Sequence, residues 1–134
     1  MRRKIFVDEN LPPLVASALS ATFKKHLFRS ATDESLRSVE DVVLCRDLAD
    51  RDYDAIITGD RNQLVNTPER VALREAGLHW IGLPAVEATG VEQIAAQLSL
   101  TVPAVADLLT SWPEEPTALR LRAHLHTVLH RETL

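Results

Sequence analysis

Residues 4–13, with the sequence KIFVDENLPP, decide the fold of this chain. The apolar run Ile5-Phe6-Val7 predicts a short strand that is buried on both faces. The two prolines that follow predict the start of a helix, because the first helical turn needs no N–H donor. Asp8 is therefore expected at the carboxyl end of an inner strand, which is where ligands bind in open parallel α/β sheets. A carboxylate at that edge can bind a hard cation such as Mg²⁺.

The same arrangement of strand and acid recurs at residues 55–62, AIITGDRN. Ala55 to Thr58 predicts a second inner strand, and Asp60 follows at its carboxyl end. The pattern predicts two further strands, at 26–29 and 78–83, a loop at 30–38, and helices at 11–25, 38–49 and 67–76. Strands that alternate with helices in this way form parallel sheets. The expected fold class is a three-layer α/β/α domain with a parallel sheet of about four strands.

The pattern of apolar residues changes after residue 86, from alternating strands and helices to helical spacing alone. Apolar residues recur at helical spacing in three later stretches, at 91–98, 102–109 and 121–129. We therefore divide the chain into an α/β core at 1–86 and an all-helical C-terminal extension of the same domain at 87–134. We expect this extension to cover the sheet, to form a homodimer or to hold a partner protein.

Length and composition restrict the class of protein. The chain has 134 residues, which is enough for one domain with a sizeable core. Its net charge of −4 gives no overall basic surface for nucleic acid, although an enzyme needs only a local basic rim. The single cysteine, Cys45, excludes an intrachain disulfide and suits the reducing cytoplasm. No apolar run is long enough for a membrane span and no secretory signal is visible, so we expect a cytoplasmic protein without membrane attachment.

Three acids are expected to meet at one edge of the sheet: Asp8, Asp60, and either Asp41 or Glu40. Parallel topology places the ends of the two inner strands side by side, and the start of the helix at 38–49 can reach the same edge. Neighbouring carboxylates repel one another, so the cluster implies Mg²⁺ or Mn²⁺, which activates water and stabilises charge at phosphorus. Five polar neighbours are expected to support the acids, by holding them or by contacting a substrate phosphate: Glu9, Asn10, Thr58, Arg61 and Asn62.

Each acid also has a purely structural interpretation. Asp8 suits the positive end of a helix dipole, but its two polar neighbours exceed what one helix start needs. Asp41 is explained equally well as the acid of a capping box that begins at Ser38. Asp60 is also a common type of turn residue, although its match to the position of Asp8 favours a functional role.

Other reactive residues give weaker signals. His126 and His130 share a helix flank at a spacing that suits a metal pair, but His124 points elsewhere and a solvated face explains all three. Cys45 lies in an apolar helix without a paired base, which favours a buried thiol. The sequence contains no phosphate-binding Walker loop, dinucleotide fingerprint or nucleophile elbow.

Two of these motifs resemble a known family. The segments FVDENLPP and DAIITGDRNQL look like those of PIN-like domains, in particular a small group whose chains begin with a strand and Asp-Glu-Asn-Leu-Pro. The resemblance covers residues 4–84. Asp8 matches the first acid of that group and Asp60 the third, with Thr58 two positions before it. Asn62 stands where the group usually has aspartate, and Asp41 or Glu40 is nearest to the second acid.

The resemblance implies a function. PIN domains are typically Mg²⁺- or Mn²⁺-dependent ribonucleases, and many are the VapC-type toxin of a bacterial toxin–antitoxin pair. It therefore implies RNA as substrate and an antitoxin protein as partner, with Asp8, Asp41 and Asp60 as metal ligands and Asn62 assisting. Two alternatives stay open. One is a catalytically inactive PIN-like binding module, and the other is a Mg²⁺-binding receiver-like or phosphohydrolase domain. The second alternative would need a lysine on a late strand, and no lysine follows Lys25 in this chain.

Overall fold

The chain folds around one parallel sheet, seen here in a computed structural model that describes residues 1–122 and 133. The strands lie in the order β2-β1-β3-β4-β5, and every neighbouring pair is parallel. Their bounds are Lys4–Val7 (β1), Leu27–Ser30 (β2), Ala55–Thr58 (β3), His79–Gly82 (β4) and Ala118–Arg120 (β5). The predicted three-layer α/β class is confirmed, with β1 and β3 as adjacent inner strands.

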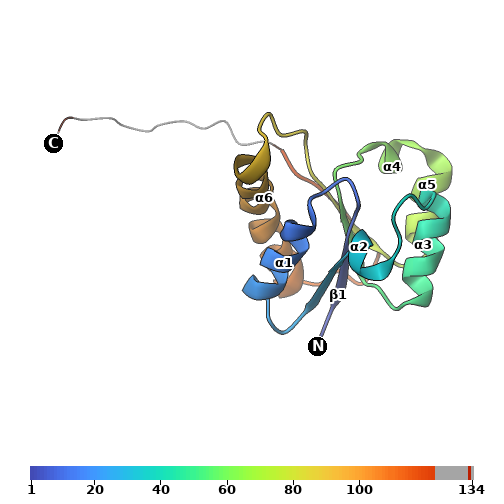
Figure 1. Cartoon of the computed structure of the whole chain (residues 1–134). Helices are drawn as coiled ribbons and strands as arrows, with labels where there is room; N and C mark the ends of the chain where they lie inside the picture. Colours follow the sequence, from blue (N-terminus) through green and yellow to red (C-terminus); the bar gives the residue numbers. More distant parts are fainter. Residues whose placement is uncertain (123–132, 134) are drawn as a thin grey trace.

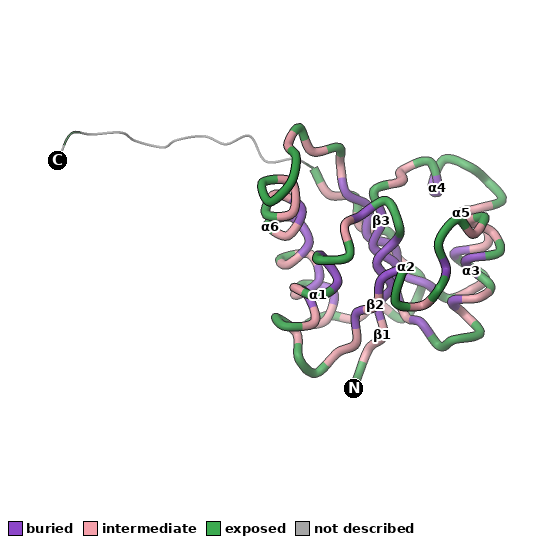
Figure 2. The backbone as a smooth tube through the Cα atoms, viewed as in Figure 1, coloured by how far each residue is buried: buried purple, intermediate pink, exposed green. Residues whose placement is uncertain are grey.

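Helices cover both faces of the sheet (Figure 1). On one face lie α1 (Pro13–Thr22) and the long α6 (Gly90–Thr110). The other face carries α3 (Asp41–Asp50) and α5 (Thr67–Glu75), together with two helices of one turn, α2 (Ala31–Glu34) and α4 (Asn62–Val65). Figure 2 shows that the buried segments follow the central strands and the inner sides of these helices.

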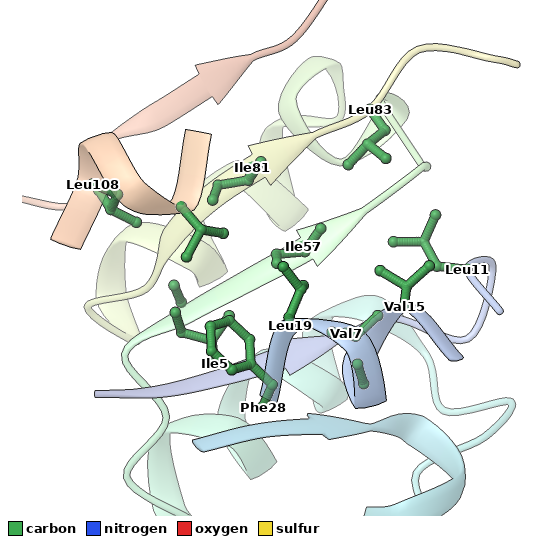
Figure 3. Close-up of a cluster of buried hydrophobic side chains, with 13 residues drawn as sticks. Ile5, Val7, Leu11, Val15, Leu19, Phe28, Ile57, Ile81, Leu83 and Leu108 are labelled. Atoms are coloured by element: carbon green, nitrogen blue, oxygen red, sulfur yellow. The ribbon is translucent and has the colours of Figure 1, made fainter. Parts of the chain in front are cut away.

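The alternation of side chains along the strands builds two cores. Ile5 and Val7 point to the face that α1 and α6 cover and share a core with Leu108, and Figure 3 shows them beside Leu19. Phe6 lies between them in sequence and points to the opposite face, where it joins the core beneath α3 and α5. This period of two fixes which face each strand residue occupies. The parallel direction of the strands brings their carboxyl ends, and the polar residues after them, to one edge of the sheet.

The C-terminal extension differs from the prediction in two respects. The sheet has five strands where about four were expected, and the fifth belongs to the extension, which is therefore not all-helical. The stripes at 91–98 and 102–109 form a single helix, α6, with Pro103 inside it. In the predicted helix at 121–129, Leu121 instead follows β5, and residues 123–129 lie outside the described part of the chain.

The capping box and two helix starts also lie elsewhere than predicted. The box is formed by Ser30 and Asp33 at the start of α2, within the stretch that was expected to be a loop. Ser38 has a backbone φ of 60°, whereas an N-cap residue needs an extended backbone, so it caps nothing. Glu40 is the N-cap residue of α3 and makes no side-chain cap bond. Asn66 caps α5 where Thr67 was expected.

Within residues 1–122, we find no helix that is both long enough and apolar enough to cross a membrane.

Candidate active site at the carboxyl ends of β1 and β3

Asp8 lies at the point where the strand order reverses. The chain places β2 on one side of β1 and then crosses back to place β3 on the other side. In open parallel sheets, ligands bind outside the carboxyl ends of the strands at such a switch point. The backbone N–H of Asp8 extends the ladder by donating to the carbonyl of Ile57 at 2.9 Å. This bond holds the carboxylate of Asp8, which is only 6 % exposed, beside the end of β3.

Thr58 joins the two strand ends through its hydroxyl. The Oγ1 atom donates to Oδ2 of Asp8 at 2.8 Å and accepts from Nδ2 of Asn10 at 3.2 Å. It also accepts the backbone N–H of Asp60 at 3.0 Å. The side chain of Asn10 completes this arrangement by accepting the N–H of Gly59 at 2.9 Å. Thr58 is fully buried, so its hydroxyl orients groups on both strands.

An open pocket of about 440 Å³ collects the predicted acids. Asp8, Asp41 and Asp60 all line it, although they come from β1, α3 and the loop after β3. Glu40 lines the same pocket, so both candidates for the second acid reach the site. The other lining residues are Glu9, Asn10, Ser38, Val39 and Glu69. Every ionisable side chain in this lining is acidic, which makes the pocket strongly negative.

Gln63 connects Asp8 to Asp41 beneath this pocket. Its Nε2 lies 3.3 Å from Oδ2 of Asp8 and 3.1 Å from Oδ1 of Asp41. Its Oε1 accepts the indole N–H of Trp80 on β4 at 3.0 Å. No such link is present for Glu40, whose side chain makes no cap bond and is exposed. The contacts of Gln63 therefore favour Asp41 as the second acid.

Charge repulsion within the pocket affects two carboxyl groups. Burial raises the pKa of Asp8, and the charge of Asp41 raises it further, against the lowering effect of hydrogen bonds from Thr58, Glu9 and Gln63. Burial and the charge of Asp41, with smaller effects from other acids in the pocket, also raise the pKa of Glu69. A cation would relieve both effects, because it favours the charged carboxylates.

The donor atoms suit a divalent ion in chemical type. All the acids in the pocket offer oxygen, which is the ligand that Mg²⁺ and Mn²⁺ prefer. Within the described part of the chain, no three His, Cys, Asp or Glu side chains already lie together at the spacing of a metal site. Asp8, Asp41 and Asp60 line the same pocket and offer carboxylate oxygens, which fit such an ion in donor type.

The remaining predicted residues lie around the pocket in different roles. Glu9 is exposed, and its Oε2 accepts the backbone N–H of Ser38 at 2.7 Å, which ties the loop before α3 to the end of β1. Asn62 begins α4, and its backbone N–H donates to Oδ1 of Asp60 at 3.0 Å, but its side chain does not line the pocket. Arg61 points away, because its guanidinium donates to the carbonyl of Leu121 after β5.

Sequence reasoning missed Gln63 and Glu69. Gln63 lies in α4, a helix of one turn that is too short to show periodicity, and its burial depends on Trp80, far along the chain. Glu69 reads from the sequence as an ordinary first-turn acid of α5. A signal did exist for it, because Asp41 occupies the same kind of position at the start of α3.

The weaker candidates do not join this site. His124, His126 and His130 lie outside the described residues. Cys45 is buried on the inner side of α3, and burial raises the pKa of its thiol to about 12. This thiol is therefore protonated at neutral pH and unsuited to act as a nucleophile.

Comparison with known families agrees with the geometry. A family model described as a PIN like domain matches residues 3–85, which is more than half of the 134 residues. The match spans β1 to β4 and every acid that lines the pocket. No curated protein and no solved structure matches the chain significantly. The extent of the family match shows that this chain belongs to the PIN-like domain family.

Proposed function

We propose that this chain is a metal-dependent endoribonuclease that acts as the toxin of a type II toxin–antitoxin pair. The observation that carries the proposal is the pocket in which Asp8, Asp41 and Asp60 meet at the switch point of a PIN-like fold. PIN-like domains are commonly nucleases, and acidic sites of this kind bind the cations that phosphodiester hydrolysis uses.

The proposed chemistry is hydrolysis of a phosphodiester bond in RNA. Mg²⁺ or Mn²⁺, when bound, would supply a Lewis acid and a water of lowered pKa. Hydrolysis forms a bond from a water oxygen to phosphorus and breaks the bond from phosphorus to the leaving oxygen, and the proton that the water loses balances the proton that the leaving oxygen takes up. Asp8, Asp41 and Asp60 would hold the ion. Asn62 would assist from the start of α4, through the bond of its N–H to Asp60.

The residues around the acids supply the rigidity that such a site needs. Thr58 fixes one carboxylate oxygen of Asp8, and the backbone N–H of Glu9 fixes the other at 2.8 Å. Both bonds leave Asp8 in a single orientation without any bound ion. A preorganised ligand loses less freedom on binding, so these bonds favour ion capture.

RNA needs positive charge near this negative pocket. Arg70 and Arg74 would provide it from α5, the helix that also carries Glu69, and both line a second pocket of about 420 Å³. Arg61 is held by the segment after β5, so we assign it to the fold rather than to phosphate binding. An RNA strand whose phosphate lies at Asp8 would continue across α4 towards Arg70.

The toxin assignment adds a partner and a compartment. We propose that a cognate antitoxin protein inhibits the chain and that both act in the cytoplasm, where RNA and a free thiol such as Cys45 coexist. We also propose that residues 87–134 complete the same domain as residues 1–86. This proposal is supported by Val105 and Leu108 of α6, which are buried in one core with Ile5 and Val7. Homodimerisation stays a prediction.

One observation favours a second candidate, a PIN-like binding module without activity. The amide of Gln63 already bridges two of the acids, and no three carboxylates in residues 1–122 stand at ligand spacing. A protein that binds a partner through this pocket would not need the cation.

Cleavage of labelled RNA separates the two candidates. Single-stranded and structured RNAs would be incubated with Mn²⁺ and either wild type, Asp8→Ala or Asp107→Ala, an exposed control on α6. The nuclease proposal expects cutting by wild type and the control, and loss of cutting in Asp8→Ala or with a chelator. No cutting by pure wild type, or equal cutting by Asp8→Ala, would reject it.

A further inference from the structure

Gln63 is unusual among the polar residues of this fold because it is almost fully buried and yet contacts two acids. Its side chain is 3 % exposed, and its amide lies between β4 and the floor of the acidic pocket. The single turn of α4 places it there directly after the loop that carries Asp60. An amide that is buried in this place requires hydrogen-bond partners, because burying it is unfavourable unless its donors and acceptors are paired.

Trp80 determines which way the amide faces. The indole N–H can only donate, so the Gln63 atom at 3.0 Å from it must be the carbonyl oxygen Oε1. The amide nitrogen then necessarily faces the carboxylates. Its two hydrogens suffice for one bond to Asp8 and one to Asp41. Every hydrogen-bonding group at the end of Gln63 therefore has a partner.

The position of Trp80 is itself tightly restricted. Trp80 is 1 % exposed on β4, and its ring lies over Gly82 two residues later. A Cβ atom at Gly82 would stand only 1.9 Å from Cη2 of that ring, so only glycine leaves room for it. Gly82, Trp80 and Gln63 thus form a rigid support that runs from the sheet to the two acids.

We infer that Gln63 is a positioning residue that holds Asp8 and Asp41 as a pair, ready to receive a cation. The inference rests on the proposed function to the extent that the acids bind a metal, and it adds a group outside the predicted acids. Gln63 would not touch the ion or the RNA. Instead, its two N–H groups draw together carboxylates that would otherwise repel each other, and its bond to Trp80 fixes their place.

Two substitutions at this position should act in opposite directions on metal binding. Gln63→Met keeps a long side chain of similar length but removes both bonds, so Asp8 and Asp41 lose their common support. Groups that orient metal ligands typically contribute 10- to 100-fold to affinity, and we expect a loss in that range. Gln63→Glu keeps an acceptor for Trp80 and places a further carboxylate beside the other two. This variant also loses both N–H bonds, but the added negative charge should outweigh that loss, so that Mn²⁺ binds roughly 10-fold more tightly.

The experiment is calorimetric titration of Mn²⁺ into wild type, Gln63→Met, Gln63→Glu and Gln93→Glu, with thermal unfolding of each in the absence of metal. Gln93→Glu on α6 is the matched control, because it adds the same charge away from the pocket. We expect weaker binding for Gln63→Met, and tighter binding with a lower metal-free melting temperature for Gln63→Glu. The control should resemble wild type in both respects.

The outcomes separate this inference from the nuclease proposal. Equal Mn²⁺ affinity in wild type and Gln63→Met would overturn the inference, as would a similar loss in both Gln63 variants, because the added charge of glutamate would then lie away from the bound ion. A wild type that binds Mn²⁺ with the expected pattern but cuts no RNA would support the role of Gln63 and reject the nuclease. A wild type that cuts RNA while the Gln63 variants bind Mn²⁺ like wild type would support the nuclease proposal and overturn the role of Gln63.

Discussion

The hydroxyl of Thr58 donates a 2.8 Å hydrogen bond to Oδ2 of Asp8, a residue that lies 50 positions earlier in the chain. This bond joins the carboxyl ends of β3 and β1 in the middle of the sheet, where the strand order reverses. The same oxygen atom of Thr58 accepts the N–H of Asp60, so one side chain orients both of the acids that the two motifs supply. The site therefore depends on a buried hydroxyl that is not itself expected to bind metal.

Thr58→Val should weaken both the fold and the site. Valine keeps the shape but removes the hydroxyl, and it leaves the carboxylate of Asp8 and the N–H of Asp60 without their shared partner. The loss of a buried hydrogen bond to a charged group costs about 1.5–3 kcal/mol. Urea unfolding measures the change, and Thr110→Val is the control, because its hydroxyl bonds only to Ala106 of its own exposed helix turn. Equal losses in both variants would contradict the role given to Thr58.

Glu69→Gln should stabilise the metal-free protein at neutral pH. Burial and the charges of Asp41 and Asp60 raise the pKa of Glu69, so its ionised form is unfavourable in the folded state. Removing the charge should raise the free energy of unfolding by roughly 0.5 kcal/mol or more. Thermal unfolding without metal measures the gain, and it should shrink when Mn²⁺ is added. Glu75→Gln, at the exposed end of the same helix, should give no such gain.

Stability should fall as the pH falls below about 6.5, in part because of His79. Its Nδ1 accepts the N–H of Thr117 at 3.0 Å and holds the segment that leads into β5. Burial and the charge of Arg3 lower the pKa of His79, against a smaller opposite effect of Asp54. As the pH falls, His79 therefore binds a proton in the unfolded chain before it does so in the folded protein. The stabilisation that is present above pH 6.5 is lost as the pH falls from 6.5 to the lower pKa of His79 in the folded protein.

The contribution of His79 can be isolated by comparison with His79→Gln, measured as the free energy of unfolding between pH 5 and pH 8. Glutamine still offers an acceptor but does not titrate, so the difference between wild type and variant should shrink as the pH falls. His26 acts in the same direction, since its pKa is also lowered and its Nδ1 accepts the N–H of Arg3. A difference that stays constant across this range would refute the assignment.

Gly82→Ala should destabilise the core beneath the site. Its Cβ would approach Cη2 of Trp80 to 1.9 Å, and the ring is buried and cannot move aside freely. Overpacking of this kind costs about 1–3 kcal/mol. Gly59→Ala is the matched control, because its nearest contact would be Oδ1 of Asn10 at an ordinary 3.5 Å. Urea unfolding that ranks Gly59→Ala as the more harmful change would show that the packing of Trp80 is not as described.

Much of the fold could be predicted from local patterns of apolar and polar residues in the sequence. The runs Ile5-Phe6-Val7 and Ala55 to Thr58 are apolar and end at polar residues, so both inner strands and their parallel pairing could be predicted. Asp8 and Asp60 then fall at one edge by topology alone. The existence of β5 was not predicted, because Ala118–Arg120 is short, lies at the sheet edge and lacks β-branched residues.

The parts of the site that were not predicted depend on contacts between residues that lie far apart in the sequence. Ser30 and Ser38 both have an aspartate three positions later, and only the backbone conformation decides which of them caps a helix. The burial of Gln63 is set by Trp80, which lies 17 residues away on β4. No periodicity in one turn of helix reveals such a contact. Sequence patterns therefore find the acids and miss the group that links two of them.

The most direct test of the account is a crystal structure determined with Mn²⁺, in which the anomalous signal locates the ion without reference to any assumed site. The account predicts a peak within about 2.5 Å of carboxylate oxygens from Asp8, Asp41 and Asp60, with Gln63 still bonded to Trp80. A protein that cleaves RNA with Mn²⁺ but carries its ion elsewhere, or carries none at the ends of β1 and β3, would contradict it.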